Sequence, residues 1–170
     1  MHILYESIPA ELHSKIDKWL NELSSENGNL YDAYVQTMAD DELVITADTV
    51  VILGDEVMGK PHDEADAKRM LGELSGRTHQ VTTGVTLSTR ERQMSFSVVT
   101  NVTFKQLSSD EIDYYVRTYH PMDKAGAYGI QEWIGYIGVT ALEGSYFNVM
   151  GLPVQRIYEA LKTFCETLSK

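Results

Sequence analysis

Apolar and polar positions along the chain fall into segments with helical or strand-like spacing. Residues 9–23 carry apolar side chains at helical intervals, so the pattern predicts a helix from Pro9 to Leu23. A second predicted helix follows Pro61, with Asp63 as its N-cap and Gly76 as its stop. A third begins at a capping box, and the last begins at Pro153. The apolar stripes predicted for the last three helices are Ala67, Met70, Leu71 and Leu74; Ile112, Tyr115, Val116 and Tyr119, after the capping box of Ser108 and Glu111; and Val154, Ile157, Tyr158 and Leu161.

Strand patterns lie between these helices. Thr78 to Ser88 alternates strictly, and a second alternating run ends at Phe104 after the polar turn 89–92, so the two runs predict an antiparallel hairpin. A glycine-rich loop is expected from His120, with a further strand over Tyr136–Leu142. Because helices and strands alternate irregularly and one strand pair is a hairpin, the predicted fold class is α/β with a mixed sheet. No repeat or linker divides the sequence, so residues 1–170 are predicted to form a single domain.

The run Leu43 to Ile52 is apolar and β-branched except for a lone carboxylate, Asp48, with Thr49 beside it. A carboxylate inside a buried strand is costly unless it is paired or binds a metal. One interpretation is that Asp48 caps a turn between two short strands. The other is functional: the chain turns at Gly54 and returns Lys60 near the acid, a pairing suited to a phosphate substrate and its metal.

The composition of the chain excludes several classes of binding partner and of cellular location. The net charge of −11 argues against a nucleic-acid polymer or an anionic membrane surface as the partner, but not against a small nucleotide. No apolar run reaches the roughly 18 residues of a membrane span. The first residues lack a secretory signal, and the one cysteine, Cys165, excludes an internal disulfide, so we expect a cytoplasmic protein.

Two further glycine-rich segments are candidate ligand loops. Residues 121–131 contain Lys124 and Gln131, and the Gln131 amide can both donate to and accept from a base. Residues 144–153 precede a helix and could hold an anion, although a structural turn explains them equally well. His79 lies on the apolar face of its strand and is expected to be a core histidine, and Cys165 is expected to be a small core residue.

Five motifs occur in a fixed order and carry a resemblance to a known family. They are Ala47-Asp48-Thr49-Val50-Val51, Gly59-Lys60-Pro61, Leu74-Ser75-Gly76-Arg77-Thr78-His79, Asp123-Lys124-Ala125-Gly126-Ala127-Tyr128-Gly129-Ile130-Gln131, and Gly144-Ser145-Tyr146 through Gly151-Leu152-Pro153. In this order the sequence resembles the Maf family of nucleoside triphosphate pyrophosphatases, once called septum-formation proteins.

The resemblance implies an elongated Maf/ITPase-like mixed α/β fold with a nucleotide cleft between two lobes. It also implies metal-dependent hydrolysis of a nucleoside triphosphate to the monophosphate and pyrophosphate. By the same resemblance, Asp48 acts as general base and metal ligand, Lys60 holds phosphate, and Thr49 and Gln131 mark the subgroup that prefers dTTP and UTP. The physical interpretation agrees: Mg²⁺ or Mn²⁺ would bridge carboxylate and phosphate, while Lys60, with Lys124, would offset charge on the pyrophosphate.

The N-terminal region departs from the family pattern. Family members open with a strand and a Ser-x-Ser-Pro-Arg-Arg loop, and nothing similar precedes Glu6, which is matched to an acidic family position and is the second predicted metal ligand. Lys15 and Lys18 are candidate substitutes for the arginines. We therefore expect weak catalysis and a bare sheet edge near residues 43–47 that favours a homodimer. Two alternatives stay open: a nucleotide-binding protein without turnover, and a structural partner in cell division.

Overall fold

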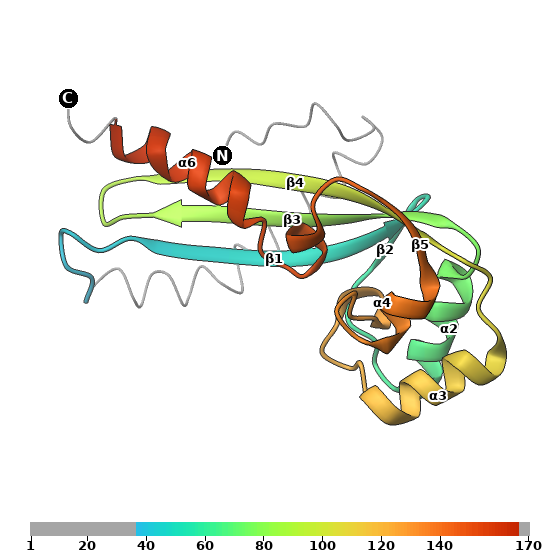
Figure 1. Cartoon of the computed structure of the whole chain (residues 1–170). Helices are drawn as coiled ribbons and strands as arrows, with labels where there is room; N and C mark the ends of the chain where they lie inside the picture. The colour runs from blue at the N-terminus through green and yellow to red at the C-terminus, as the bar shows by residue number, and fades with distance from the viewer. Residues whose placement is uncertain (1–36, 167–170) are drawn as a thin grey trace. The chain divides into compact units, whose positions relative to one another are not determined.

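The computed structural model describes residues 37–166, in which strands and helices alternate along the chain (Figure 1). Five of the described segments are strands of one sheet, and helices flank it, which confirms the predicted α/β class. The strands are β1 (Val44–Leu53), β2 (Glu56–Met58), β3 (Thr78–Ser88), β4 (Gln93–Phe104) and β5 (Val139–Glu143). The predicted helix from Pro9 to Leu23, together with Glu6, Lys15 and Lys18, lies outside the described residues.

The sheet has the strand order β2-β1-β3-β4-β5. β2 pairs antiparallel with β1 from Val51 to Leu53, and β5 pairs antiparallel with the end of β4. The predicted hairpin of β3 and β4 is confirmed, with the Thr89 N–H donating to the Arg92 carbonyl across the turn. Short connections of this kind are what antiparallel neighbours allow.

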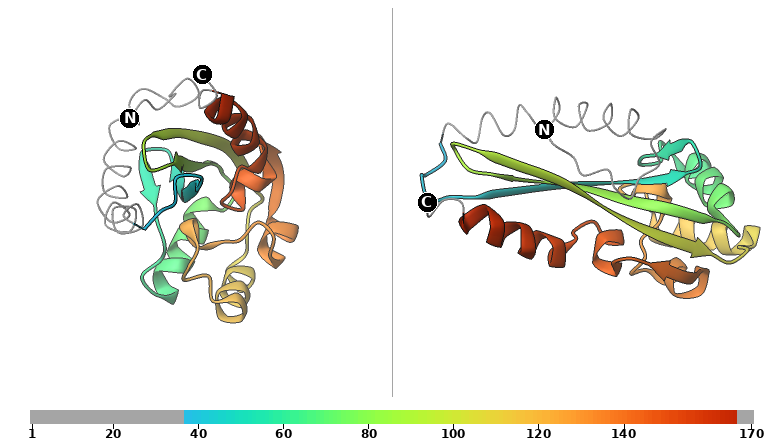
Figure 2. Two further views of the ribbon diagram at one scale, coloured as in Figure 1. Left: turned by 90° about the vertical axis from the view of Figure 1, so that its left-hand side faces the viewer. Right: turned by 90° about the horizontal axis from the view of Figure 1, so that it is seen from above.

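The capping residues predicted for two of the helices cap those helices in the structure. The Asp63 side chain accepts from the Asp66 N–H at the start of α2, and Ser108 and Glu111 form the complete capping box of α3. α2 and α3 lie side by side (Figure 2). None of the helices in the described part of the chain is long and apolar enough to cross a membrane. The helices are α2 (Glu64–Leu74), α3 (Ser109–Tyr119), the short 3-10 helix η1 (Ala125–Ala127), α4 (Trp133–Gly138), α5 (Tyr146–Val149) and α6 (Val154–Glu166).

The chain forms two compact units, with the boundaries inside β1, β3 and β4 and at the start of α6. One unit comprises Thr49–Thr83 and Val98–Val154, and its core is a single apolar cluster. The other comprises the described residues up to Asp48, then Gly84–Ser97, and the chain from Gln155. The larger buried side chains of the first unit include Met58, Leu71, Leu74, Phe104, Tyr115 and Ile134.

Three arginines make contacts within the second unit, two of them on the β3–β4 turn and one on α6. The Arg92 guanidinium lies 3.9 Å from the centroid of the Phe164 ring, and Arg156 lies 5.3 Å from that of Phe96. Arg90 donates to Asp40 at 2.6 Å and also to the Met38 carbonyl. Stacking over a ring lets each Arg stem cover apolar surface while its charge stays near water.

Two predictions about secondary structure are wrong: one gives a helical segment as a strand, and the other gives exposed residues of a helix as buried. Residues 133–138 form helix α4, so the strand predicted from Tyr136 begins only at Val139. In α6 the predicted stripe residues Val154 and Tyr158 are 43% and 60% exposed, whereas Ile157 is buried as predicted, together with Ala160 and Phe164. The small Ala160 allows close packing on that side, which an apolar stripe drawn from large residues misses.

Two smaller predictions about burial are also wrong. Tyr119, placed in the buried stripe of α3, is 36% exposed and stacks on Tyr115 instead. Cys165, expected in the core, is exposed. On β3 the side chain of Thr82 is fully buried although it falls on the polar face of the alternating pattern, so this strand is covered on both faces at its centre.

Candidate functional site

β1 is one continuous strand through Asp48, which corrects the interpretation of this residue as a turn cap between two short strands. Residues 45–47 are exposed and burial begins at Val50, so the first half of the run is not the buried strand that its composition predicts. The Asp48 side chain is half-buried, and its carboxylate makes no hydrogen bond or ion pair within the described part of the chain. None of the described residues therefore occupies the carboxylate oxygens of Asp48, which can bind a ligand.

Alternation along β1 places the Asp48 side chain on the face opposite that of Thr49. One ligand can reach both side chains only where the strand has an open edge. β2 pairs with β1 from Val51 to Leu53, and among the described residues no other strand adjoins β1 on that side. Asp48 and Thr49 thus lie just beyond the paired segment.

Two loops cover the Thr49 face of β1. Gly126, with φ of 66°, lies so close to Val51 that an added Cβ would be 2.8 Å from the Val51 Cγ2. Gly151, with φ of 103°, lies over Thr49, and an added Cβ would be 3.6 Å from its Oγ1. Both positive φ values favour glycine. Thr49 and Val51 are two residues apart on one face, so three of the motifs meet on this strand.

The Gly126 N–H donates to the Gly59 carbonyl at 3.0 Å, which joins the loop of Lys124 to the segment of Lys60. Lys60 is exposed and forms no ion pair with the described residues. The Lys124 ammonium, which donates to Asp123, holds the pKa of that carboxyl below its usual range, and the charge of Lys60 adds to this effect. The structure therefore brings the segment of Lys60 and residues 123–126 into one corner.

Lys124 is held more tightly than Lys60. Its Nζ lies 2.8 Å from the Asp123 Oδ1 and 3.2 Å from the Glu132 Oε1, and its side chain is 21% exposed. Partial burial disfavours the charge, but the bonds to the two carboxylates outweigh it and raise the pKa of Lys124. The sequence assigned Lys124 to the pyrophosphate; the structure shows its charge already offset by two acids.

Glu132 is in turn held by Tyr115, whose hydroxyl donates to the Glu132 Oε2 and accepts from the Gly129 N–H at 3.0 Å. Burial, with the neighbouring Glu132 carboxylate, raises the pKa of the Tyr115 hydroxyl, so it stays protonated and remains a donor. Sequence reasoning missed Glu132 and Tyr115. Gln131 is exposed, and its backbone carbonyl accepts from the Tyr136 hydroxyl at 2.7 Å.

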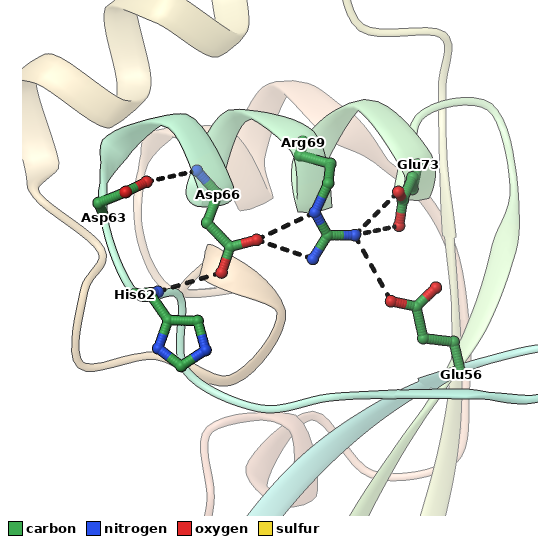
Figure 3. A network of polar contacts seen from close by, with 6 residues as sticks. All are labelled: Glu56, His62, Asp63, Asp66, Arg69 and Glu73. Atoms are coloured by element: carbon green, nitrogen blue, oxygen red, sulfur yellow. Dashed lines mark hydrogen bonds and ion pairs between the residues drawn. The ribbon is translucent and has the colours of Figure 1, made fainter.

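A network around Arg69 fixes both ends of the Lys60 segment (Figure 3). Arg69 donates to Asp66 at 2.8 and 3.0 Å, to Glu73 at 2.9 and 3.0 Å, and to Glu56 on β2 at 3.4 Å. Asp66 also accepts from the His62 N–H at 3.1 Å. The Asp66 and Glu73 carboxylates raise the pKa of Arg69, and the backbone bond from His62, with Arg69, lowers that of Asp66.

Thr49 belongs to a polar chain that runs into the protein. Its Oγ1 lies 2.8 Å from the Thr83 Oγ1, and Thr83 donates to the Asn148 carbonyl at 3.1 Å. Thr83 and Asn148 are fully buried. Sequence reasoning placed Thr83 on an apolar strand face and Asn148 in a glycine-rich segment without giving either a role; a threonine among apolar positions was the available signal.

The chain belongs to the Maf-like protein family, whose sequence pattern matches residues 9–164. A dTTP/UTP pyrophosphatase of Phocaeicola vulgatus is 68% identical over 130 residues, which are 76% of this chain and 67% of that protein. A protein of the same name from Parabacteroides distasonis is 57% identical over 133 residues, 78% of this chain and 69% of that protein. One from Bacteroides thetaiotaomicron is 51% identical over 158 residues, 92% of this chain and 79% of that protein.

Proposed function

We propose that this chain hydrolyses nucleoside triphosphates, dTTP and UTP in preference to others, to the monophosphate and pyrophosphate. The observation that carries this proposal is the meeting of the motif segments on β1, where Gly126 lies against Val51 and Gly151 against Thr49. The relatives named dTTP/UTP pyrophosphatase supply the reaction and the substrate class. The net charge of −11 supports a free nucleotide, not a nucleic-acid polymer or a membrane, as the partner, and we propose a cytoplasmic location.

In the proposed reaction Asp48 accepts a proton from water as the water oxygen attacks the α-phosphorus. The bond between the α-phosphorus and its bridging oxygen breaks, and pyrophosphate leaves. Lys60 lies exposed at the corner described above and offsets negative charge on the leaving pyrophosphate. Lys124, bound to Asp123 and Glu132, keeps the shape of that corner.

A divalent metal, Mg²⁺ or Mn²⁺, fits the residues available. Mg²⁺ is commonly bound by one or two carboxylates together with substrate phosphates and water, and not by a cage of protein ligands. The described residues contain no group of three His, Cys, Asp or Glu side chains suited to a metal, but Asp48 offers one unpaired carboxylate. Asp48, with Glu6 as the second proposed ligand, would hold the ion, which would polarise the phosphate oxygens.

The homodimer remains a proposal. The first residues of β1 are exposed, Ile45 at 41%, and among the described strands only β3 adjoins β1 before Val51, so the other edge could join a second copy of the chain. Size-exclusion chromatography with light scattering checks this directly, and Ile45→Lys is expected to shift a dimer toward the monomer.

The activity is tested with the full chain, a panel of six nucleoside triphosphates and Mg²⁺ or Mn²⁺, in water enriched in ¹⁸O. We expect pyrophosphate and a monophosphate that carries the label, because water attacks the α-phosphorus. Formation of diphosphate and inorganic phosphate would refute the proposal. Asp41→Asn, an exposed acid in the turn before β1, is the matched control for Asp48→Asn. Binding of dTTP without turnover by the full chain would favour the nucleotide-binding alternative.

A further inference from the structure

Residues 129–132 form a turn that carries Gln131 on the protein surface. The Glu132 N–H donates to the Gly129 carbonyl at 3.0 Å and closes the turn. Between these two ends, Ile130 is buried and Gln131 is exposed. The position of Gln131 therefore depends on what holds Gly129 and Glu132.

Both ends of this turn meet one hydroxyl group, that of Tyr115 on α3. The Gly129 N–H donates to this hydroxyl at 3.0 Å, and the hydroxyl donates to the Glu132 Oε2. The direction of both bonds is fixed, because an amide N–H can only donate and an ionised carboxylate can only accept. The single hydroxyl hydrogen of Tyr115 thus binds Glu132, while its oxygen binds Gly129.

Tyr115 gives the turn a rigid support. Its side chain is fully buried, and its ring stacks on that of Tyr119, with the two centroids 5.1 Å apart. The helix that carries both residues begins at a complete capping box and packs beside α2. Because a tyrosine side chain has only two χ angles, burial of the ring also fixes the place of the hydroxyl group.

Lys124 holds the other oxygen atom of the Glu132 carboxylate. Its Nζ lies 3.2 Å from the Glu132 Oε1, so the two carboxylate oxygens have separate partners. The turn is also closely packed, because a Cβ added to Gly129 would lie 2.9 Å from the Glu132 Cδ and 3.1 Å from the Lys124 Cε. The backbone carbonyl of Gln131 accepts from the Tyr136 hydroxyl. A buried polar network whose members are all paired makes such a turn rigid.

We propose that Tyr115 is a positioning residue that fixes the turn 129–132 and so sets where Gln131 meets the substrate. This inference rests on the proposed function and on Gln131 as a residue of its site. Tyr115 lies outside the five motifs and acts through the turn. Loss of its hydroxyl would leave the buried Gly129 N–H without its acceptor and one Glu132 oxygen without its donor, and an unpaired buried group favours a change of backbone conformation.

The first test measures the turn without any ligand. Tyr115→Phe keeps the ring and removes only the hydroxyl group. Amide hydrogen exchange at Gly129, followed by NMR, is expected to become at least about tenfold faster, because the N–H loses its buried acceptor. Tyr119→Phe is the matched control, since Tyr119 lies on the same helix and its hydroxyl forms no hydrogen bond with the described residues. Unchanged exchange in Tyr115→Phe would overturn the proposal.

Kinetics with dTTP separate positioning from mere support of the fold. Tyr115→Phe is expected to raise KM about fivefold with little change in kcat, because a misplaced Gln131 weakens binding of substrate and transition state alike. In a Gln131→Ala background, the same substitution is expected to change KM by less than about twofold, because the side chain that Tyr115 positions is gone. An equal loss of activity in both backgrounds would show a purely structural role and overturn the proposal. Thermal unfolding of each variant confirms that the compared proteins are folded.

Calorimetric affinities for dTTP, measured with the full chain, separate this inference from the proposed activity. Binding that weakens in Tyr115→Phe only where Gln131 is present, without release of pyrophosphate, would support the inference and refute the proposed hydrolysis. If the chain hydrolyses dTTP and Tyr115→Phe keeps the wild-type KM and affinity, the proposed function stands and the inference is wrong. Absence of both binding and hydrolysis would refute the two together.

Discussion

Acidification is expected to destabilise the protein through one buried histidine, His79 on β3. Its side chain is 2% exposed, its Nε2 lies 2.7 Å from the Tyr128 hydroxyl, and its ring meets those of Phe104 and Tyr128 edge to face. Burial lowers the pKa of His79 to about 4. The Nδ1 atom has no hydrogen-bond partner among the described residues, so no acceptor is in place for the second proton.

The sign of the effect follows from proton linkage. The unfolded chain binds a proton at His79 below about pH 6.5, whereas the folded protein does so only near its lowered pKa of about 4. The stability that the folded protein gains from keeping His79 neutral is therefore fully present above about pH 6.5 and is lost as the pH falls toward 4. From these two pKa values the loss is about 2 kcal/mol at pH 5 and about 3 kcal/mol at pH 4.

Urea unfolding between pH 7.5 and pH 4 measures this loss in wild type and in His79→Leu. The variant is expected to be less stable at pH 7.5, since it removes the His79 partner of the buried Tyr128 hydroxyl, but its free energy of unfolding is expected to fall less steeply with acid. Subtracting the two curves removes the contribution of the carboxylates common to both. The exposed His62 provides the control, because His62→Gln should follow the wild-type curve. Parallel curves for wild type and His79→Leu would refute the reasoning.

Three further predictions concern the site itself. Asp48→Asn is expected to lower pyrophosphate release by about 10²-fold or more while far-UV circular dichroism and the melting temperature stay unchanged; activity within a few-fold of wild type would remove Asp48 from the proposed mechanism. Lys60→Met is expected to lower kcat with little effect on stability, whereas Lys124→Met, which leaves Asp123 and Glu132 without their cation, is expected to cost about 1–3 kcal/mol of unfolding free energy. A loss of stability in Lys60→Met together with a loss of kcat alone in Lys124→Met would show that Lys124 acts on the substrate and Lys60 supports the fold. Gln131→Ala is expected to narrow the preference for dTTP and UTP over purine triphosphates, and an unaltered ratio would show that Gln131 does not contact the base.

The parts of the fold that the sequence predicts well are those with local signals. The Asp63 cap of α2 and the Ser108–Glu111 box of α3 depend on side chains within three residues of one another. The bounds of β3 follow from strict alternation over eleven residues. By contrast, the stretch 133–138 is rich in glycine and Ile, which local preference assigns to a strand or loop, and its helix is set by tertiary packing.

The site is predicted only in part because its key contacts are distant in sequence. Asp48, Thr49 and Lys60 carry visible chemistry in their motifs, but the partner of Thr49 is 34 residues away and the carbonyl that Thr83 meets is 65 residues beyond it. The difference between the exposed Lys60 and the paired Lys124 depends on Glu132, whose position in sequence gives no sign of its contact with Tyr115. Pairing of this kind follows from the fold, and no spacing rule in the sequence encodes it.

β1 sets the distance between the two loops of the proposed site. Residues two apart in a strand lie on one face about 6.5–7 Å from each other, which is the separation between Thr49 under Gly151 and Val51 under Gly126. The Gly126 N–H donates to the Gly59 carbonyl and so joins this loop to the segment of Lys60. The Gly151 N–H donates to the Asn148 carbonyl, which also accepts from Thr83. The strand thus links the segment of Lys60, which is proposed to bind phosphate, to the loop that follows α5. Because both loops touch β1 through glycine, a larger side chain at either position would displace its loop from the strand, and at Gly126 it would also press on the buried Val51.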